Sequence, residues 1–510
     1  MNRSFKKILA AGIAVIMAFT AMVGCANKED EFTKLPEYSE KKYEFSAYGA
    51  PNTGVYTMDG EYLEWGPNLR TKEGYTDYKD AGLTMLFLSG TAAYSGTDWE
   101  TCECKKAWDV ALSVGIDKIL LTDKRIDALV EFKDAIVGED ANARFKSEEE
   151  LKEEIKTYLS TYITYQGFYG IRISDERDYT YIKAMGLIYK AVKQAAKELG
   201  MENIYIHLNV LPYDSVYSRF GAKGDYQDMT TAYTDYIEKY MQVTNADRIS
   251  SDVYAFRGNG ISGQFYSTAQ VIKQVADKYG ANASFCLQSF ELYSGQNHIY
   301  RAVGKSEMKM EMLSLMGMGF DHFYYYTYQI AEQRGTGWTE DTTFVNTAGE
   351  KTNVYYYGQQ LMTNAQKMAS VILNYKYLGG KFFIADMPKN DVSCYLAGPI
   401  ETNVTNSGLA FNNTHEFTLI KDVTFDNDAV FVTELKDNAN ELYMYMVQNV
   451  IDPINGQYGR TTETVSVSFG EEFTHVAELL DGNINYVKLD AGKYTRTLSA
   501  GDGVFLVPLK

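Results

Sequence analysis

The fold is decided by the stretch Gly167-Phe168-Tyr169-Gly170-Ile171-Arg172-Ile173-Ser174-Asp175-Glu176-Arg177. It is an apolar, β-prone run that ends abruptly in two carboxylates, and a long helical pattern starts almost at once. A strand that carries acidic side chains at its C-terminal end and leads into a helix is typical of α/β barrels. We therefore expect Asp175 and Glu176 to lie at the end of a barrel strand.

The rest of the chain supplies seven more units of the same kind. Eight strand–helix units in succession predict a (β/α)8 barrel over residues 43–376, closed by a long helix at 354–373. An open doubly wound sheet is the structural rival, but the sequence lacks a G-x-G-x-x-G turn after its first strand and a Walker-type motif. The predicted strands cover residues 44–50, 83–88, 116–121, 167–177, 204–210, 249–256, 283–290 and 320–328.

The pattern changes after Tyr377. Short alternating segments are separated by Gly, Asn and Asp turns up to the end of the chain. This spacing predicts a C-terminal all-β sandwich over residues 377–510, which we expect to pack against the barrel.

The N-terminal 25 residues read as a signal peptide. Lys6 and Lys7 precede an apolar run from Ile8 to Met22, which is too short and wrongly flanked for a permanent transmembrane helix. The run closes on Met22-Val23-Gly24-Cys25, which resembles a bacterial lipobox. This resemblance implies a lipid on Cys25 that anchors the protein to a membrane, at the bacterial cell surface or the periplasmic face. Residues 26–42 would then be a polar tether. The alternative is ordinary secretion with cleavage near Gly24.

Composition narrows the class of ligand. The net charge of −18 argues against nucleic acid and other polyanions, since both need a basic surface. The chain has 42 Tyr, 25 Phe and 4 Trp, and aromatic faces suit neutral sugars as well as protein cores. Neither the cysteines nor the five histidines form a metal motif, and we expect no cofactor.

Chemistry in such a barrel lies at the C-terminal ends of the strands. Carboxylates and aromatics without a phosphate cradle predict glycoside hydrolysis, in which one carboxylic acid protonates the leaving oxygen and a second carboxylate acts across the ring. A cluster of carboxylates also raises the pKa of one member. The polar and aromatic residues expected at these ends are Asp123, Asp175, Glu176, Asn209, Asp252, Gln288, Glu291, the run Tyr324 to Tyr328 and Trp338.

Two regions carry a resemblance to a known family. The stretch ending in Asp175-Glu176 resembles the G-x-x-x-x-D-E-P strand of uncharacterised bacterial barrel hydrolases, with Arg177 in place of Pro. The region from Leu287-Gln288-Ser289-Phe290 to Tyr326 resembles the strand-seven to strand-eight region of the same proteins. The barrel thereby resembles glycoside hydrolases of the clan A type, including β-galactosidase-like relatives. The resemblance implies that Glu176 is the general acid/base and Glu291 the nucleophile.

Two positions depart from the pattern of that clan. Asp175 stands where the clan usually has Asn, and on strand seven either Glu291 or Gln288 faces the pocket. If Gln288 faces it, the nucleophile is missing; Asp252 or Asp123 could then serve as base for an inverting reaction, or the protein could only bind glycan. We expect a glycoside hydrolase for a neutral oligo- or polysaccharide, with a non-catalytic glycan-binding lipoprotein as the alternative. The residues expected to bind the sugar are Asp175, Asn209, Asp252, Gln288, Tyr326 and Trp338.

Overall fold

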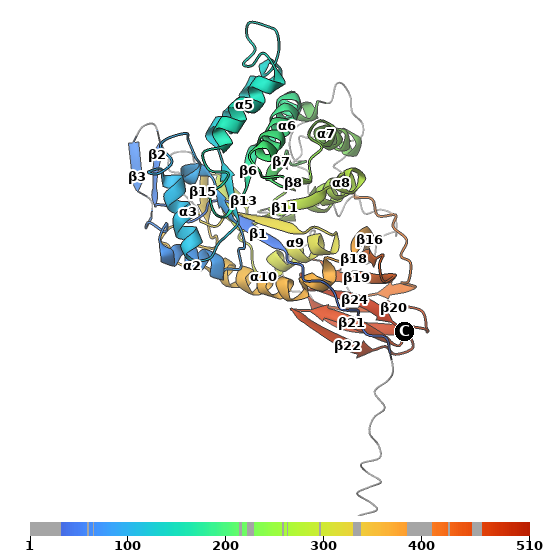
Figure 1. Cartoon of the computed structure of the whole chain (residues 1–510). Helices are drawn as coiled ribbons and strands as arrows, with labels where there is room; N and C mark the ends of the chain where they lie inside the picture. The colour runs from blue at the N-terminus through green and yellow to red at the C-terminus, as the bar shows by residue number, and fades with distance from the viewer. Residues whose placement is uncertain are drawn as a thin grey trace, which may run out of the picture.

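A computed structural model describes residues 32–58, 61–64, 66–213, 217–221, 229–257, 260–262, 264–294, 297–329, 338–384, 411–426, 429–450 and 462–510 (Figure 1). The predicted signal peptide and Cys25 lie outside these described residues. No helix within them is long and apolar enough to cross a membrane.

Eight parallel strands form one sheet in the order β1-β14-β11-β8-β7-β6-β5-β4. The two end strands approach each other, because the carbonyl of Phe45 accepts hydrogen bonds from the backbone N–H groups of Thr84 and Met85 at 2.8 and 3.0 Å. The predicted (β/α)8 barrel is therefore confirmed. Its strands are β1 (Glu44–Ala47), β4 (Leu86–Leu88), β5 (Ile119–Thr122), β6 (Phe168–Arg177), β7 (Tyr205–Val210), β8 (Arg248–Asp252), β11 (Asn282–Gln288) and β14 (His322–Tyr326).

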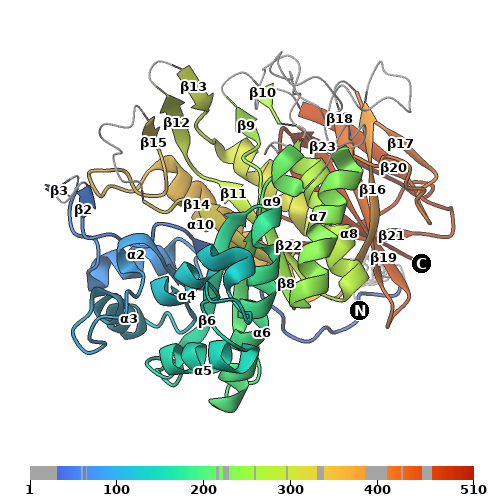
Figure 2. The ribbon, with the colours of Figure 1, turned by 90° about the horizontal axis from the view of Figure 1, so that it is seen from above.

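Helices connect the strands and cover the outside of the barrel (Figures 1 and 2). The long helix α6 that follows β6 shows why: Ile182, Met185, Ile188 and Val192 recur at helical spacing, and all four are buried. The helices are α2 (Lys72–Asp80), α3 (Glu103–Ser113), α4 (Lys124–Leu129), α5 (Glu148–Leu159), α6 (Ile182–Glu198), α7 (Met229–Thr244), α8 (Gln264–Tyr279), α9 (Lys305–Gly317) and α10 (Asn353–Ile372).

A second, antiparallel sheet follows the last barrel strands, and the sequence did not predict it. Its segments leave the carboxyl ends of β8, β11 and β14 and pair in the order β10-β9-β13-β12-β15. Each segment is only two to four residues long, which is too short for the alternation of apolar and polar side chains that would distinguish a strand from a loop in the sequence. These strands are β9 (Phe256–Arg257), β10 (Gly260–Ile261), β12 (Glu291–Ser294), β13 (Asn297–Tyr300) and β15 (Trp338–Asp341).

The C-terminal region is an antiparallel β-sandwich, as predicted. A six-stranded sheet (β16-β18-β19-β24-β21-β22) and a three-stranded sheet (β17-β20-β23) enclose a core that includes Val432, Val467 and Leu506. The strands are β16 (Lys376–Ile384), β17 (Asp422–Thr424), β18 (Ala429–Asp437), β19 (Leu442–Asn449), β20 (Thr462–Ser468), β21 (His475–Leu480), β22 (Asn483–Lys488), β23 (Lys493–Ser499) and β24 (Gly503–Leu509).

The sandwich is fixed to the barrel through α9. The hydroxyl of Ser314 on α9 donates to the side-chain oxygen of Gln448 on β19 at 2.6 Å, and both groups are buried.

The described part of the chain before the barrel contacts the sandwich: the ring of Phe32 stacks on His475 with centroids 4.0 Å apart. The hydroxyl of Tyr38 donates to Asp437 at 3.1 Å. The described part of the predicted tether thus lies against the sandwich.

Candidate active site

The carboxyl end of β6 is irregular where its two acidic residues lie. Relative to β7, the register shifts between Arg172 and Ser174 and again between Asp175 and Arg177. Glu176 lies within the second irregularity and has a φ of 47°, in the left-handed region that residues with a Cβ rarely adopt. Bulges of this kind re-aim a side chain at a strand end and are frequent beside active sites.

Glu176 contacts a second carboxyl group, that of Asp252 at the end of β8. The two side chains share a hydrogen bond, and Asp252 is only 3% exposed. Burial raises the pKa of Asp252 well above its ordinary value, and the nearby charge of Glu176 raises it further. Burial and the neighbouring carboxylate therefore favour the protonated form of Asp252, and Glu176 is the more exposed of the two groups. We call these two residues the carboxyl pair.

Asn209, at the end of β7, holds the carboxylates together. Its amide nitrogen donates to Asp175 at 2.9 Å and to Asp252 at 3.1 Å. Its amide oxygen accepts from the hydroxyls of Ser250 and Tyr324, each at 2.9 Å. Because the nitrogen of an amide only donates and its oxygen only accepts, these partners fix the orientation of the side chain. Asn209 thus sets the positions of two carboxyl groups.

Arg172 is the cation of the site. Its guanidinium donates to Asp175 at 2.9 Å, and Asp127 lies 3.9 Å away. It also interacts with the hydroxyl of Tyr48, and its side chain is 15% exposed. The carboxylates of Asp175 and Asp127 therefore compensate the charge of Arg172. Glu176 adds a further acidic group to the site.

These groups line a cavity of about 500 Å³ at the carboxyl end of the barrel strands, which we call the barrel-mouth cavity. Its volume lies in the range of ligand pockets, roughly 300–1,000 Å³. Four rings, which we call the aromatic wall, pack on one another beside the polar groups. The ring of Phe290 lies 4.9 Å from that of Tyr254 and 5.3 Å from those of Tyr300 and Tyr326, measured between centroids. Polar groups thus face an apolar surface across a space of ligand size.

Five of the predicted site residues line this cavity together. They come from strands four, five, six and eight of the barrel, as expected for side chains at the carboxyl ends of parallel strands. They are Asp175, Glu176, Asn209, Asp252 and Tyr326.

Gln288 is a correction to the predicted sugar-binding set. Its side chain is fully buried, accepts from the backbone N–H of Phe256 at 2.9 Å and donates to the carbonyls of Phe256, Phe290 and Arg301 at 3.0 to 3.2 Å. All these partners are backbone groups of the segments that follow β8 and β11. Gln288 therefore fastens the base of the antiparallel sheet and is not among the residues that line the cavity.

Glu291 also lies outside the set of lining residues. After Gln288 the chain leaves the barrel, and Glu291 is the first residue of β12, opposite Asp341 of β15. Its carboxylate accepts from the hydroxyl of Tyr293 at 2.7 Å. The next residue, Leu292, lines the cavity, and neighbouring side chains of a strand face opposite sides. The catalytic role of Glu291 remains a prediction that its position does not support.

Asp123 and Trp338 are the remaining candidates. Asp123 is fully buried and accepts hydrogen bonds from Arg125 at 2.7 to 3.0 Å and from the hydroxyl of Tyr162 at 2.8 Å, so its role is structural. The backbone of Trp338 begins β15, while its side chain lies outside the described part of the chain.

Sequence reasoning assigned no site role to the other nine lining residues, which are Tyr48, Ser89, Gly90, Arg172, Tyr254, Cys286, Phe290, Leu292 and Tyr300. Tyr48 follows directly on β1, so a search for every polar residue at a strand end would have found it. Arg172 lies within the stretch 167–177, but a single cation in the middle of a predicted strand gives no signal of a site. Tyr254 and Tyr300 belong to the segments of the unpredicted sheet.

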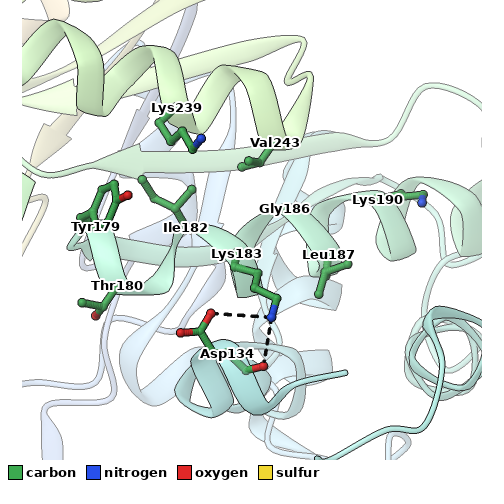
Figure 3. Close-up of a pocket in the computed structure, with 10 residues that line it drawn as sticks. All are labelled: Asp134, Tyr179, Thr180, Ile182, Lys183, Gly186, Leu187, Lys190, Lys239 and Val243. Atoms are coloured by element: carbon green, nitrogen blue, oxygen red, sulfur yellow. Dashed lines mark hydrogen bonds and ion pairs between the residues drawn. The ribbon is translucent and has the colours of Figure 1, made fainter. Parts of the chain in front are cut away.

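A second cavity, of about 730 Å³, lies outside the barrel between α6 and α7 (Figure 3). Ile182, Leu187 and Val243 supply apolar surface, and the ammonium of Lys183 pairs with Asp134. This cavity offers no carboxyl pair. Within the described residues, no group of three His, Cys, Asp or Glu side chains could hold a metal ion.

No family model and no curated protein matches the sequence. Among solved structures, a glucosidase from Croceicoccus marinus is 9% identical with a TM-score of 0.43, covering 93% of this chain and 97% of its own. An Anoxybacillus alpha-amylase is 12% identical with a TM-score of 0.47, covering 92% and 97%. An endo-1,4-beta-xylanase from Penicillium canescens is 11% identical with a TM-score of 0.39, covering 62% and 93%. The assignment of the fold therefore rests on the strand topology.

Proposed function

We propose that this protein is a glycoside hydrolase acting on neutral sugars through the carboxyl pair, Glu176 and Asp252. The observation that carries the proposal is the hydrogen-bonded contact of these two groups in a cavity that also holds an aromatic wall. Cleavage of a glycosidic bond needs one carboxylic acid and one carboxylate on either side of the reacting carbon. We assign a proton to Asp252, whose pKa burial raises, so that the pair supplies one carboxylic acid and one carboxylate.

The roles follow from the burial of each group. Asp252, which holds the proton, gives it to the glycosidic oxygen as the bond to the anomeric carbon breaks. Glu176 stabilises the positive charge that develops on this carbon and forms a covalent bond to it. Water then attacks the intermediate and gives its proton to Asp252, which frees Glu176. Retaining enzymes keep their two carboxyl groups about 5–5.5 Å apart and inverting enzymes about 6.5–9.5 Å, so a pair in contact is nearer to the retaining arrangement, and its two groups have to separate when the sugar enters.

The rest of the cavity suits a neutral pyranose. One face of such a ring is a C–H surface that packs on aromatic side chains, and Phe290 and Tyr326 supply this surface. The hydroxyls of the sugar can bond Asp175 and Arg172. An anionic sugar is disfavoured, because Asp175 and Asp127 already compensate the charge of Arg172.

A panel of aryl glycosides tests the proposal and separates the two roles. Asp252→Asn should lose activity on poor leaving groups but keep much of it on dinitrophenyl glycosides, which leave without a proton. Glu176→Gln should lose activity on both classes. If Glu176 is instead the general acid, the role that the sequence resemblance implies for it, and Asp252 the nucleophile, the two variants exchange these patterns. Binding without turnover, equal in wild type and both variants, would support the alternative of a non-catalytic glycan-binding protein.

We also propose that the protein is anchored through a lipid on Cys25. The lipobox-like sequence at residues 22–25 supports this proposal. Cells that express the full chain and are fed an alkyne-bearing fatty acid should label the wild type and not Cys25→Ala. Equal labelling of the two proteins, or none of either, would contradict the anchor.

A further inference from the structure

The backbone at the end of β6, where Glu176 has its positive φ, is held by side chains from two other segments. The carbonyl of Glu176 accepts a hydrogen bond from the guanidinium of Arg219 at 3.1 Å. The next carbonyl, that of Arg177, accepts from the hydroxyl of Tyr236 and from that of Tyr240, the latter at 3.0 Å. Both carbonyls thus accept hydrogen bonds from side chains that are distant in the chain. We call Arg219, Tyr236 and Tyr240 the bulge clamp.

Each member of the bulge clamp is itself fixed by the fold. Tyr236 and Tyr240 lie on α7, four residues and so about one turn apart, and both side chains are fully buried. Arg219 belongs to the short helix η4 (Tyr217–Phe220), which follows β7. The buried ring of Phe220 lies 5.3 Å from that of Tyr236, measured between centroids. Helix α7 therefore positions both tyrosines and supports the segment that carries Arg219.

These contacts offset an unfavourable backbone conformation. The φ of 47° costs free energy in a residue with a Cβ, and such a conformation persists only where the surrounding structure enforces it. The positions of the two carbonyls fix the backbone on the C-terminal side of Glu176, and with it the direction of the Cα–Cβ bond. This bond aims the carboxylate at Asp252. In an extended conformation the same bond would point in another direction.

We propose that Arg219 and Tyr240 are positioning residues of the barrel-mouth cavity, which hold the end of β6 in the conformation that brings Glu176 to Asp252. Neither is among the described residues that line the cavity, so both act through the backbone of β6. The effect of this contact on catalysis rests on the proposed hydrolase function, whereas the positioning itself does not.

Two tyrosines of α7 provide a matched pair of variants, Tyr240→Phe and Tyr233→Phe. Both hydroxyls are buried and donate to a backbone carbonyl, that of Tyr240 to Arg177 and that of Tyr233 to Leu211 at 2.9 Å. The Tyr233 hydroxyl also lies 3.2 Å from Oγ of Ser251, and neither of its partners belongs to β6. Tyr240→Phe should lower kcat on aryl glycosides by up to about 100-fold, the loss that a misplacement of about 1 Å can cause, with little change in KM. Tyr233→Phe should keep the wild-type kcat, and equal losses in both variants would reduce the contact to a packing role.

Arg219 is tested by a conservative and a truncating substitution. Arg219→Lys keeps a cationic donor on a long side chain, whereas Arg219→Ala removes the donor. We expect the lysine variant to retain most of the wild-type kcat and the alanine variant to lose it to the same degree as Tyr240→Phe. A wild-type kcat in Arg219→Ala would remove Arg219 from the positioning role.

A stability measurement tests the positioning without any enzymatic activity. The nearby charge of Glu176 raises the pKa of Asp252, so displacing Glu176 brings this pKa closer to its ordinary value. Asp252→Asn should then stabilise a Tyr240→Phe background less than it stabilises wild type at neutral pH, measured by urea unfolding. In a Tyr233→Phe background it should stabilise as much as in wild type. Other titratable groups also interact with Asp252, and both backgrounds retain them: Asp175, Tyr48, Tyr254, Cys286 and Tyr324.

The outcomes separate the two proposals. The same stabilisation in all three backgrounds, or the same reduction in both tyrosine backgrounds, would overturn the positioning role. A wild type inactive on all glycosides would reject the hydrolase proposal and leave the stability comparison standing.

Discussion

Replacing Asp252 with Asn should make the protein more stable at neutral pH while it removes a catalytic group. Asp252 is 3% exposed, shares a hydrogen bond with Glu176 and accepts one from Asn209 at 3.1 Å. An asparagine can replace both bonds, since its amide nitrogen donates to Glu176 and its oxygen accepts from Asn209. It mimics the protonated acid but has no proton to lose.

The sign and size of the effect follow from the raised pKa of Asp252. In the unfolded chain this carboxyl loses its proton near pH 3.9, whereas burial and the charge of Glu176 keep the proton on in the folded protein. Between these two pKa values the folded state binds more protons, so the free energy of unfolding falls as the pH rises. Each unit of pKa difference is worth about 1.4 kcal/mol. A proton kept from pH 3.9 to neutral pH spans about three units, so we expect Asp252→Asn to gain up to about 4 kcal/mol at neutral pH, as in other stability–activity trade-offs.

Urea unfolding of wild type and variant at about pH 4 and about pH 7 measures the difference. It should be small at the lower pH, where about half of the unfolded chains still hold this proton, and should grow toward neutral pH. On poor leaving groups kcat should fall by about 10²–10⁴-fold, the usual contribution of a general acid. A variant less stable than wild type at neutral pH, or a difference independent of pH, would refute the assignment of the proton to Asp252.

Three further predictions concern other parts of the fold. Gln288→Ala should lower the free energy of unfolding by about 2–4 kcal/mol, because it leaves buried backbone groups without partners; urea unfolding measures this. Glu291→Gln should leave kcat/KM unchanged on the aryl glycosides that Glu176→Gln no longer cleaves, whereas a nucleophilic Glu291 would abolish turnover. Gly186→Ala should cost about 1–3 kcal/mol in thermal unfolding without changing kcat, since the new Cβ would lie 2.9 Å from that of Val243.

The barrel could be predicted from the sequence because each of its units is a local pattern. An apolar strand, a turn and an amphipathic helix can each be recognised from a few neighbouring residues, as the buried positions 182, 185, 188 and 192 of α6 show. The antiparallel sheet at the barrel mouth could not, because its short strands exist only through pairing with segments distant in the chain. Phe290, Leu292 and Tyr300 line the cavity as part of that sheet or beside it.

The sequence by itself determined that Glu176 lies at the end of a barrel strand, since the apolar run of β6 ends there. Only the tertiary structure decided which carboxyl group it meets. Because the strands are parallel, their carboxyl ends all lie at the same end of the barrel. The backbone conformation of the last residues of each strand then determines which side chains point into the cavity. The bulge at Glu176 and the buried position of Asp252 bring one pair together, whereas the turn after Gln288 carries Glu291 into another sheet. These features depend on contacts between distant segments, which local sequence patterns do not record.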